Sequence, residues 1–269
     1  MNNQQRSLEM VSDFWEEFHH NGSHNIKSVV ILNQDSQLTS KILPRPILLI
    51  AALQDDNPET RIETAIALGQ SRAKRAVEPL IVALGDPNSQ VRYSVVQSLS
   101  QLSDARAVEP LIRALSDEDS LVRRVAAYAL GQFRDKRAIQ PLIAAFDDET
   151  FGVRLSASLA LGQIGACAVE PLLHASINGY SNEAEHALRT MNDAPRVLIS
   201  PLLAALKHED RRMRVVAAKF LMHVDDQMHR VIPALRKALA DPDGDVRHYA
   251  KVTLSVLEEK CCERSPEIQ

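Results

Sequence analysis

Seven prolines recur along the chain at nearly constant spacing, and this period limits the folds that the chain can adopt. They are Pro46, Pro79, Pro110, Pro141, Pro171, Pro201 and Pro233, separated by steps of 33, 31, 31, 30, 30 and 32 residues. Such a period is typical of proteins in which each repeat packs only on its neighbours, so that no central core forms. It predicts an all-α fold, a right-handed α-solenoid of helical hairpins, one for each proline.

Each repeat reads as two antiparallel helices joined by a short turn. In the third repeat, residues 106–115 carry apolar side chains at helical spacing. Pro110 lies near the start of this helix, where a missing N–H costs little because first-turn donors have no intrahelical partner. The second helix has one apolar face from Val122 to Leu130, and Gly131 is expected to mark its end.

Two columns of residues recur in the second helices and are assigned to the core. One is a column of leucines, and four positions before each leucine stands a mostly small residue that lets helices approach closely. The leucines are Leu68, Leu99, Leu130, Leu161, Leu188, Leu221 and Leu254; the residues before them are Thr64, Val95, Ala126, Ala157, Ala184, Ala217 and Ala250.

A charged pair recurs as well, with an aspartate six residues before an arginine. The pairs are Asp55 and Arg61, Asp86 and Arg92, Asp117 and Arg123, Asp148 and Arg154, and Asp241 and Arg247. This spacing places the carboxylate at the start of the second helix, where it can cap the helix and meet a guanidinium of its own or the neighbouring repeat. One copy per repeat favours a structural role over acid–base catalysis.

Composition is typical of stacked helices in a reducing compartment. The 269 residues are 45% hydrophobic but only 4% aromatic, and a net charge of −4 lacks the basic excess with which nucleic-acid binders neutralise phosphates. The polar first residues do not resemble a secretory signal, and the longest aliphatic run, 47–53, is too short to cross a bilayer. Three cysteines, two of them adjacent, form no disulfide framework. We expect a cytoplasmic protein without nucleic-acid partners or membrane insertion.

The repeat unit resembles the HEAT-like repeats first named for phycobilisome lyases. The resemblance is carried by R-A-V-E-P-L-I at 106–112, by Asp117 with Val122 and Arg123, and by A-L-G-Q at 129–132, and it covers about Arg45 to Leu257. Proteins of this type include paired lyases that attach or remove bilins on phycobiliproteins, proteins that promote phycobilisome breakdown, and many scaffolds. The resemblance implies a phycobiliprotein or a second HEAT-like subunit as partner, and a bilin as the ligand of an enzymatic member; no other cofactor is expected.

Two other families of enzymes are built from similar repeats. Di-iron deoxyhypusine hydroxylases take their ligands from His-Glu pairs that begin second helices, whereas here His208-Glu209 stands alone in a predicted turn. DNA-glycosylase solenoids hold phosphates on a basic face. A partial basic strip is available here, but neighbouring acidic residues favour solvated turns; its members are Arg123, Arg124, Arg211, Arg212 and Arg214.

A variable stripe is expected on the second helices, facing away from the core columns and lining the concave side of the stack. Its middle is apolar around Arg124, which suits a protein partner or a tetrapyrrole whose propionates pair with arginine. Lateral packing between helices is the alternative use of these residues. The predicted binding residues are Tyr93, Gln97, Arg124, Tyr128, Leu155, Leu159 and His186.

The fifth repeat departs from the pattern. From Pro171 to Leu188 it is three residues shorter than the third repeat from Pro110 to Leu130, and the missing residues are assigned to the turn. Ser181 takes the arginine position, so the charged pair is absent. The change predicts a different superhelical twist between repeats 1 to 4 and repeats 6 and 7, with neutral drift in a tolerant loop as the alternative.

Both ends lie outside the period. We divide the chain into an N-terminal helix and connector (1–43), the solenoid (44–259) and a flexible tail (260–269). The N-terminal helix is amphipathic and is expected to cap the first repeat. As the alternative, it docks a partner through Phe14, Trp15 and Phe18. Cys261 and Cys262 are taken as incidental thiols of the tail, with a metal or redox role as the alternative.

No nucleophile with its base, no phosphate-binding glycine loop and no convergent set of metal ligands is recognisable. The sequence therefore favours a non-catalytic protein-binding scaffold or adaptor that uses its concave face. Its resemblance implies a role on phycobiliproteins, in phycobilisome assembly or degradation. The alternative is a subunit of a bilin lyase or isomerase that attaches or removes a tetrapyrrole.

Overall fold

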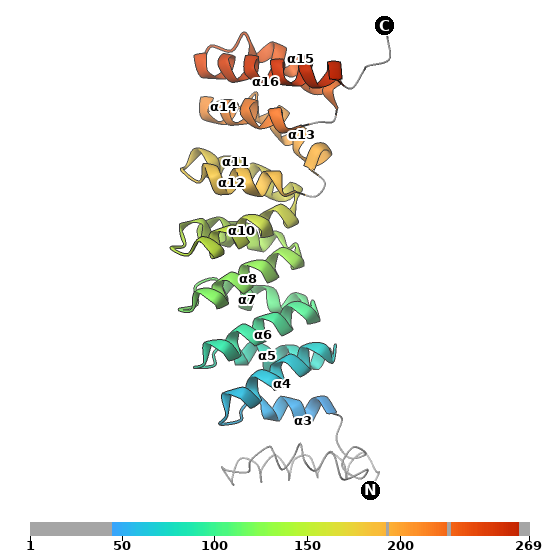
Figure 1. Cartoon of the computed structure of the whole chain (residues 1–269), viewed down its shortest axis with the longest axis vertical. Coiled ribbons are helices and arrows are strands. Elements are labelled where there is room, and N and C mark those ends of the chain that lie inside the picture. Colours follow the sequence, from blue (N-terminus) through green and yellow to red (C-terminus); the bar gives the residue numbers. More distant parts are fainter. Residues whose placement is uncertain (1–44, 192–193, 225–226, 264–269) are drawn as a thin grey trace. The chain divides into compact units, whose positions relative to one another are not determined.

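The computed structural model describes residues 45–191, 194–224 and 227–263, and every regular element in these ranges is a helix (Figure 1). The chain divides into two compact units, Met1–Asp104 and Ala105–Gln269, here called unit 1 and unit 2. Each unit is built from helical hairpins, and the predicted all-α solenoid class is confirmed.

The helices contact one another in consecutive pairs, and each pair contains one recurring proline. Unit 1 holds α3 (Arg45–Ala52) with α4 (Pro58–Gln70), and α5 (Val77–Ala83) with α6 (Ser89–Leu102). Unit 2 holds α7 (Val108–Ala114) with α8 (Ser120–Phe133), α9 (Ile139–Ala144) with α10 (Phe151–Ile164), α11 (Val169–Ile177) with α12 (Ser181–Arg189), α13 (Ala194–Ala205) with α14 (Arg211–Phe220), and α15 (Met228–Ala238) with α16 (Gly244–Glu263). The last helix therefore continues past residue 259, where the solenoid was expected to end.

The six recurring prolines after Pro46 occupy two different helical positions. In α5, α7, α9 and α11 the proline is the third residue, and a short 3₁₀ turn precedes the helix. This agrees with the predicted first-turn position. Pro201 and Pro233 instead lie inside α13 and α15, because these helices begin several residues earlier. There the missing N–H removes one intrahelical hydrogen bond.

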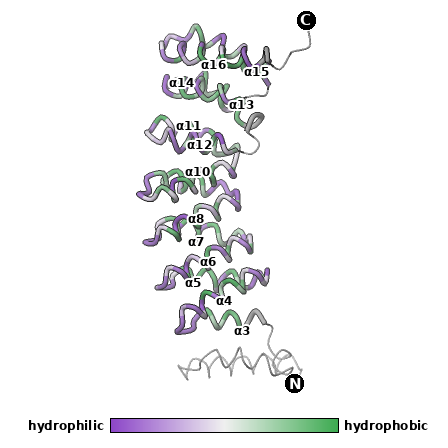
Figure 2. The backbone as a smooth tube through the Cα atoms, viewed as in Figure 1, coloured by the Kyte–Doolittle hydropathy of each residue, from purple (hydrophilic) through white to green (hydrophobic). Residues whose placement is uncertain are grey.

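Both predicted core columns are buried. The leucine column is at most 6% exposed along its whole length, and the column of mostly small residues is at most 5% exposed. Figure 2 shows hydrophobic colour along the helices and hydrophilic colour concentrated at the turns. Burial of these columns between neighbouring helices is the main stabilising contribution to each unit.

The glycines near the ends of second helices have a packing role, which corrects their assignment as helix ends. Gly131 lies inside α8, and a Cβ placed on it would come within 2.7 Å of the Ala160 Cα of α10. Gly69 of α4 meets the Ser98 Cα of α6 in the same way, at 2.8 Å. The residue with left-handed backbone at the end of α8 is Arg134, with φ 51°. Glycine therefore lets consecutive second helices come into backbone contact.

The recurring arginines bind two parts of the stack at once. Arg123 Nη1 donates to the carbonyls of Asp117 and Glu118 in its own turn, at 2.9 and 3.1 Å. Its Nε and Nη2 donate to the Asp148 carboxylate of the next repeat, at 2.6 and 3.1 Å. In unit 1, Arg61 binds Asp86 with the same bidentate geometry. The guanidinium thus closes one turn and joins it to the next.

The sequence predicts that the aspartates of these pairs cap the second helices. In the structure they do not. The Asp148 carboxylate accepts the backbone N–H of Thr150, which immediately precedes α10. Where a side chain does cap the helix, it belongs to the residue two positions after the aspartate, such as Asn57, Asn88 or Asp119. The aspartate therefore orients the turn and receives the neighbouring arginine.

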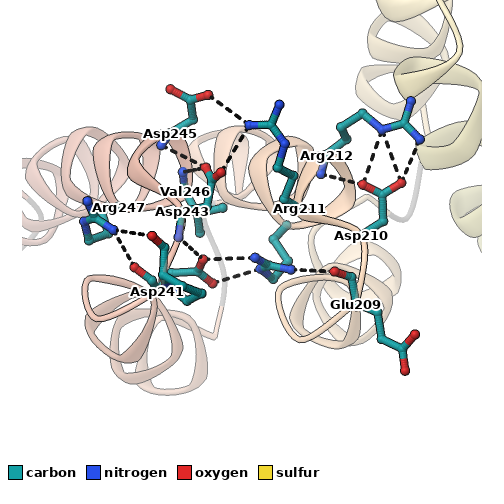
Figure 3. Close-up of polar contacts among 11 residues, drawn as sticks. Glu209, Asp210, Arg211, Arg212, Asp241, Asp243, Asp245, Val246 and Arg247 are labelled. Atoms are coloured by element: carbon teal, nitrogen blue, oxygen red, sulfur yellow. Dashed lines mark hydrogen bonds and ion pairs between the residues drawn. The ribbon is translucent and has the colours of Figure 1, made fainter.

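Arg214 shows that the arginine can act without an aspartate six residues before it. Its Nη1 donates to the carbonyls of His208 and Glu209, because these contacts use the backbone and any residue can supply them. Its Nε and Nη2 bind Asp241 at 2.9 and 3.1 Å, and Figure 3 shows this carboxylate between α14 and α16. A search for aspartate-arginine pairs misses this arginine for that reason.

In the fifth repeat the missing residues come from the second helix. The α12 helix has 9 residues against 14 in α10, while α11 has 9 against 7 in α7. The first turn of the second helix, which carries the arginine in other repeats, is the part that α12 lacks. Arg154 of α10 meets Glu183 at 3.5 Å in place of an aspartate. The predicted change in superhelical twist stays a prediction.

The aspartates that these arginines bind, here called the ladder aspartates, have lowered pKa values. Burial of the Asp148 carboxyl opposes its charge, but the hydrogen bonds from Arg123 and from Thr150 outweigh this effect and lower its pKa. The pKa values of Asp86 and Asp241 are lowered for the same reasons. A carboxyl whose pKa is lower in the folded than in the unfolded state stabilises the fold above its unfolded pKa, and this stabilisation is lost as the pH falls through the folded pKa.

We predict that Arg123→Ala lowers the free energy of unfolding at neutral pH by about 2 kcal/mol, because it leaves a part-buried carboxylate without its main partner. The difference from the unsubstituted protein should begin to shrink below about pH 4, where the carboxyl of the unfolded chain takes up a proton, and should be lost as the pH falls further through the lowered pKa of Asp148 in the folded state. Chemical denaturation over a series of pH values measures both effects. Arg113→Ala, which removes an exposed arginine of α7, is the control and should stay within about 0.5 kcal/mol. Equal losses in both variants, or a difference that does not change with pH, would contradict the role of the bridge.

We also predict that Gly131→Ala destabilises unit 2 by about 1–3 kcal/mol, because the added methyl group forces α8 and α10 apart. Alanine has the higher intrinsic helix propensity, so a gain in stability is the expected result if the contact does not matter. Gly85→Ala is the matched control, since its Cβ would meet nothing closer than the Val82 carbonyl oxygen at 3.5 Å. Thermal unfolding of the two variants decides between these outcomes.

Candidate functional site

The second helices of unit 2 present a set of outward-facing side chains that the core does not use. We call this set the second-helix face and define it by Leu121, Arg124 and Tyr128 on α8, Phe151, Leu155 and Leu159 on α10, and His186 on α12. The α10 helix packs against both α8 and α12, so these residues lie on three adjoining helices. The face belongs to unit 2 alone.

On α8, the outward residues follow the helical repeat. Leu121, Arg124 and Tyr128 lie at positions i, i+3 and i+7, which places them on one side of the helix. Tyr128 is 49% exposed and Leu121 is 41% exposed. A Cβ added to Gly152 of α10 would lie 3.3 Å from the Arg124 Cδ, so the aliphatic part of Arg124 extends toward α10 across a glycine. The glycine provides room for this side chain between the two helices.

Phe151 is the most exposed aromatic residue of the face. It is the first residue of α10, and 67% of its surface is accessible to solvent. The Arg154 guanidinium carbon lies 5.6 Å from the centre of its ring, within the range of a cation–π contact. Leu155 and Leu159 continue along the same helix and are half-buried. The face therefore combines one largely exposed ring with partly covered aliphatic side chains.

His186 ends the face on α12. The residue is partly exposed, yet its Nδ1 atom is buried and has no hydrogen-bond partner within the described part of the chain. A buried nitrogen without a partner loses the hydrogen bonds that water would supply. His186 therefore ends the face with a polar nitrogen whose hydrogen-bonding capacity is unused.

The structure divides the predicted stripe between the two units. Arg124, Tyr128, Leu155, Leu159 and His186 lie in unit 2, on adjoining helices. The other two members, Tyr93 and Gln97, lie on α6 of unit 1. There the Gln97 side-chain amide donates to the Tyr93 hydroxyl at 3.1 Å. The partial burial of the two leucines agrees with lateral packing, whereas the exposure of Tyr128 does not.

Sequence reasoning missed Leu121 and Phe151. A signal was available for Phe151, because the first position of the second helix is elsewhere polar, glycine or proline. Those residues are Pro58, Ser89, Ser120, Ser181, Arg211 and Gly244. The docking residues predicted on the N-terminal helix, Phe14, Trp15 and Phe18, lie outside the described residues, as do the side chains of Cys261 and Cys262.

Arg124 differs from the other arginines of the predicted basic strip. Arg123 and Arg214 bind ladder aspartates, and Figure 3 shows Arg211 and Arg212 beside acidic side chains as well. Arg211 approaches Asp243 at 3.1 Å, and Arg212 approaches Asp210 at 2.9 Å. Arg124 has no ion pair with any residue that the structure describes. The strip is thus largely neutralised, and one positive charge stays available on the second-helix face.

Within residues 45–191, 194–224 and 227–263, no group of three or more His, Cys, Asp or Glu side chains is arranged to hold a metal ion. In the same ranges no single helix is long and apolar enough to span a membrane. One bent pair of helical segments, Phe151–Ile164 with Ala166–Ile177, has sufficient length and apolar composition when the two are taken together.

Comparison with known proteins finds a family match and several structures of similar fold. Residues 46–130, 108–191 and 182–255 match the family model for HEAT repeats. No curated protein sequence matches the chain significantly.

Three of the similar solved structures illustrate the range of the fold. The complex of CpcE and CpcF of phycocyanin lyase from Nostoc sp. PCC7120 is 24% identical, covering 80% of this chain and 95% of that one, with a TM-score of 0.46. The archaeal HEAT-like repeats protein from Thermococcus onnurineus NA1 is 13% identical over 81% and 98%, with a TM-score of 0.44. Human deoxyhypusine hydroxylase is 22% identical over 80% and 84%, with a TM-score of 0.32. These similarities concern the fold.

Proposed function

The chain belongs to the HEAT-repeat family, and we propose that it acts as a protein-binding scaffold whose partner docks on the second-helix face of unit 2. Repeat proteins of this kind expose long rows of variable side chains on a constant scaffold. The repeating residues are buried here, so a partner must be recognised through the residues that differ between repeats. The second-helix face collects such residues.

The exposure of Phe151 at the start of α10, next to Gly152 where the Arg124 side chain approaches this helix, is the observation that carries this proposal. An aromatic ring that is 67% exposed leaves most of its apolar surface in water, and the fold of α10 does not require an aromatic residue at its first position. Exposed aromatic residues around an arginine are the composition of binding hot spots. Leu121 and Tyr128 extend the apolar surface on the neighbouring helix.

The charge of Arg124 predicts one feature of the partner's surface. A guanidinium binds a carboxylate through two parallel hydrogen bonds, and the exclusion of water by surrounding apolar side chains strengthens this pairing. A partner that fits the face therefore presents an acidic side chain among apolar ones. Contact with Phe151 and Tyr128 would supply most of the binding energy, and the ion pair would set the register.

Phycobiliproteins are the first partners that we propose to test, with a second HEAT-like subunit as the next. The motif R-A-V-E-P-L-I with its following D-x-x-x-x-V-R supports this choice, because it resembles the repeats of phycobilisome-associated proteins. Binding of a phycobiliprotein would place the scaffold in phycobilisome assembly or degradation.

We predict that the double substitution Tyr128→Ser and Phe151→Ser weakens binding of the captured partner by about thirtyfold or more, because it removes both exposed rings. Partners are first captured from the native lysate and identified by mass spectrometry, and affinities are then measured by calorimetry with purified components. Val82→Ser, which removes a 76% exposed apolar residue of α5, is the control and should leave the affinity unchanged. An unchanged affinity of the double variant would remove the second-helix face as the docking site. The absence of phycobiliproteins among the captured proteins would remove that partner class.

The alternative function, a bilin lyase or isomerase subunit, draws support from the same arginine. A tetrapyrrole presents apolar rings and propionate groups, which match the surface around Arg124. Under this alternative, phycocyanobilin mixed with the purified protein should show a red-shifted absorbance band that Arg124→Gln weakens. A spectrum equal to that of free phycocyanobilin would contradict it. The scaffold proposal expects this second outcome.

A further inference from the structure

We propose that unit 2 carries a second binding site, a groove beside α11 that takes an extended polypeptide segment through one lysine or arginine side chain. The groove has a volume of about 430 Å³ and lies between α9 and α11, the first helices of the fourth and fifth repeats. Ligand sites in proteins commonly measure about 300–1,000 Å³. This site belongs to the first helices, whereas the proposed scaffold site belongs to the second helices.

The groove lies where the repeat loses an arginine. One repeat earlier, Arg137 Nη1 donates to Glu109 Oε1 at 3.2 Å and thereby joins the first helices of the third and fourth repeats. Aligned on the prolines, the position of Arg137 is taken by Cys167 and the position of Glu109 by Gln140. Both replacements line the groove. A cysteine is much shorter than an arginine, so the space of one long cationic side chain is left open.

The charge of the groove favours a cation. Glu170 of α11 is the one carboxylate among the residues that line it, His174 is the one basic residue, and neither lysine nor arginine is among them. Glu170 has no ion pair with a side chain that the structure describes, and the sequence of the sixth repeat has Val197 in the arginine position that would pair with it. Asp147 does not line the groove, but it accepts the hydrogen bond of the lining residue Tyr180 and so adds a second negative charge behind that side chain. A lysine or arginine side chain entering the groove would therefore pair with Glu170.

The remaining polar groups suit a polypeptide backbone. Gln140 and Asn178 line the groove from α9 and from the residue after α11. Each side-chain amide can donate through its NH2 group to a peptide carbonyl and accept at its oxygen from a peptide N–H. Ile143, Pro171 and Ala175 supply apolar surface between them. An extended segment can satisfy both amides while its basic side chain reaches Glu170.

One wall of the groove is held in place before any ligand binds. Tyr180 packs on Phe146 with ring centres 5.8 Å apart, and its hydroxyl donates to Asp147 Oδ2 at 2.5 Å. Its backbone N–H donates to the Ala175 carbonyl at 3.1 Å. Gly179, with φ 115°, makes the bend that brings Tyr180 back over α11. The short turn of the fifth repeat thus builds the wall, which lowers the entropy cost of binding.

Cys167 provides a direct reporter of occupancy, because its exposed thiol lies in the groove. In the full-length Cys261→Ser/Cys262→Ser protein it is the one remaining cysteine. The probes are pools of short N-acetylated, C-amidated peptides with a central lysine or arginine flanked by mixed alanine, serine and leucine; matched pools carry glutamate or glutamine at the centre. The lysine and arginine pools should slow alkylation of Cys167 by iodoacetamide by the factor 1 + [L]/Kd, which is about threefold at twice the dissociation constant. The glutamate and glutamine pools should leave the rate unchanged.

Three variants test the assigned contacts. Glu170→Gln should abolish the difference between the lysine and glutamate pools. Glu109→Gln, the equivalent glutamate paired with Arg137, is the matched control and should keep it. Arg196 directly precedes Val197 in the sequence. Because the proposal pairs Glu170 with the ligand and not with Arg196, Arg196→Gln should not weaken protection by the lysine pool.

Binding of a fluorescein-labelled lysine peptide, followed by fluorescence polarisation, gives a readout that is independent of the thiol. Cys167→Arg restores the arginine of the repeat and should abolish this binding by filling the groove. Equal protection by lysine and glutamate pools, undiminished selectivity in Glu170→Gln, or full binding by Cys167→Arg would each overturn the proposal.

Discussion

One guanidinium holds two neighbouring turns of the stack in register. In Arg123 the same group binds two carbonyls of its own turn and both oxygens of the next repeat's aspartate. The contact is part-buried, and its planar fork matches the carboxylate, so a lysine could not replace it. Because the turn precedes the second helix, this bridge also sets where the second helix begins. The surfaces that can bind a partner depend on that placement.

Close packing of the second helices is the other interaction that fixes how neighbouring repeats sit against each other. Gly131 and the small residues before each leucine bring the helix backbones together, and the leucines fill the space between hairpins. Little room remains for variation on the buried side. Differences between repeats are therefore confined to the outward side, where Phe151 and Arg124 are found. Partner recognition and stability thus fall on opposite sides of the same helices.

The fifth repeat interrupts two sets of ion pairs, the arginine–aspartate pairs between turns and the arginine–glutamate pair between first helices. Loss of the first turn of α12 removes the ladder arginine, and replacement of an arginine by Cys167 removes the pair that joins the first helices. Arg154 pairs with Glu183 in place of an aspartate, and Tyr180 contacts Phe146 and Asp147. These substitute contacts keep the hairpins packed while a groove opens beside α11. A repeat protein can therefore gain a site where its pattern fails.

The sequence by itself determined the number of hairpins and the buried columns, because residues that recur at the same helical position face the same neighbour in every repeat. It also pointed to Arg124 and Tyr128, whose column varies. Only the tertiary structure decided that Gly131 is a contact and not a helix end, that Arg123 joins its own carbonyls to a distant carboxylate, and that Phe151 is exposed. It also divided Tyr93 from Arg124 by placing them in different units. The physical reason is that periodicity specifies which face of a helix is buried, whereas a backbone contact, a carbonyl acceptor or an open groove depends on what the next helix brings opposite.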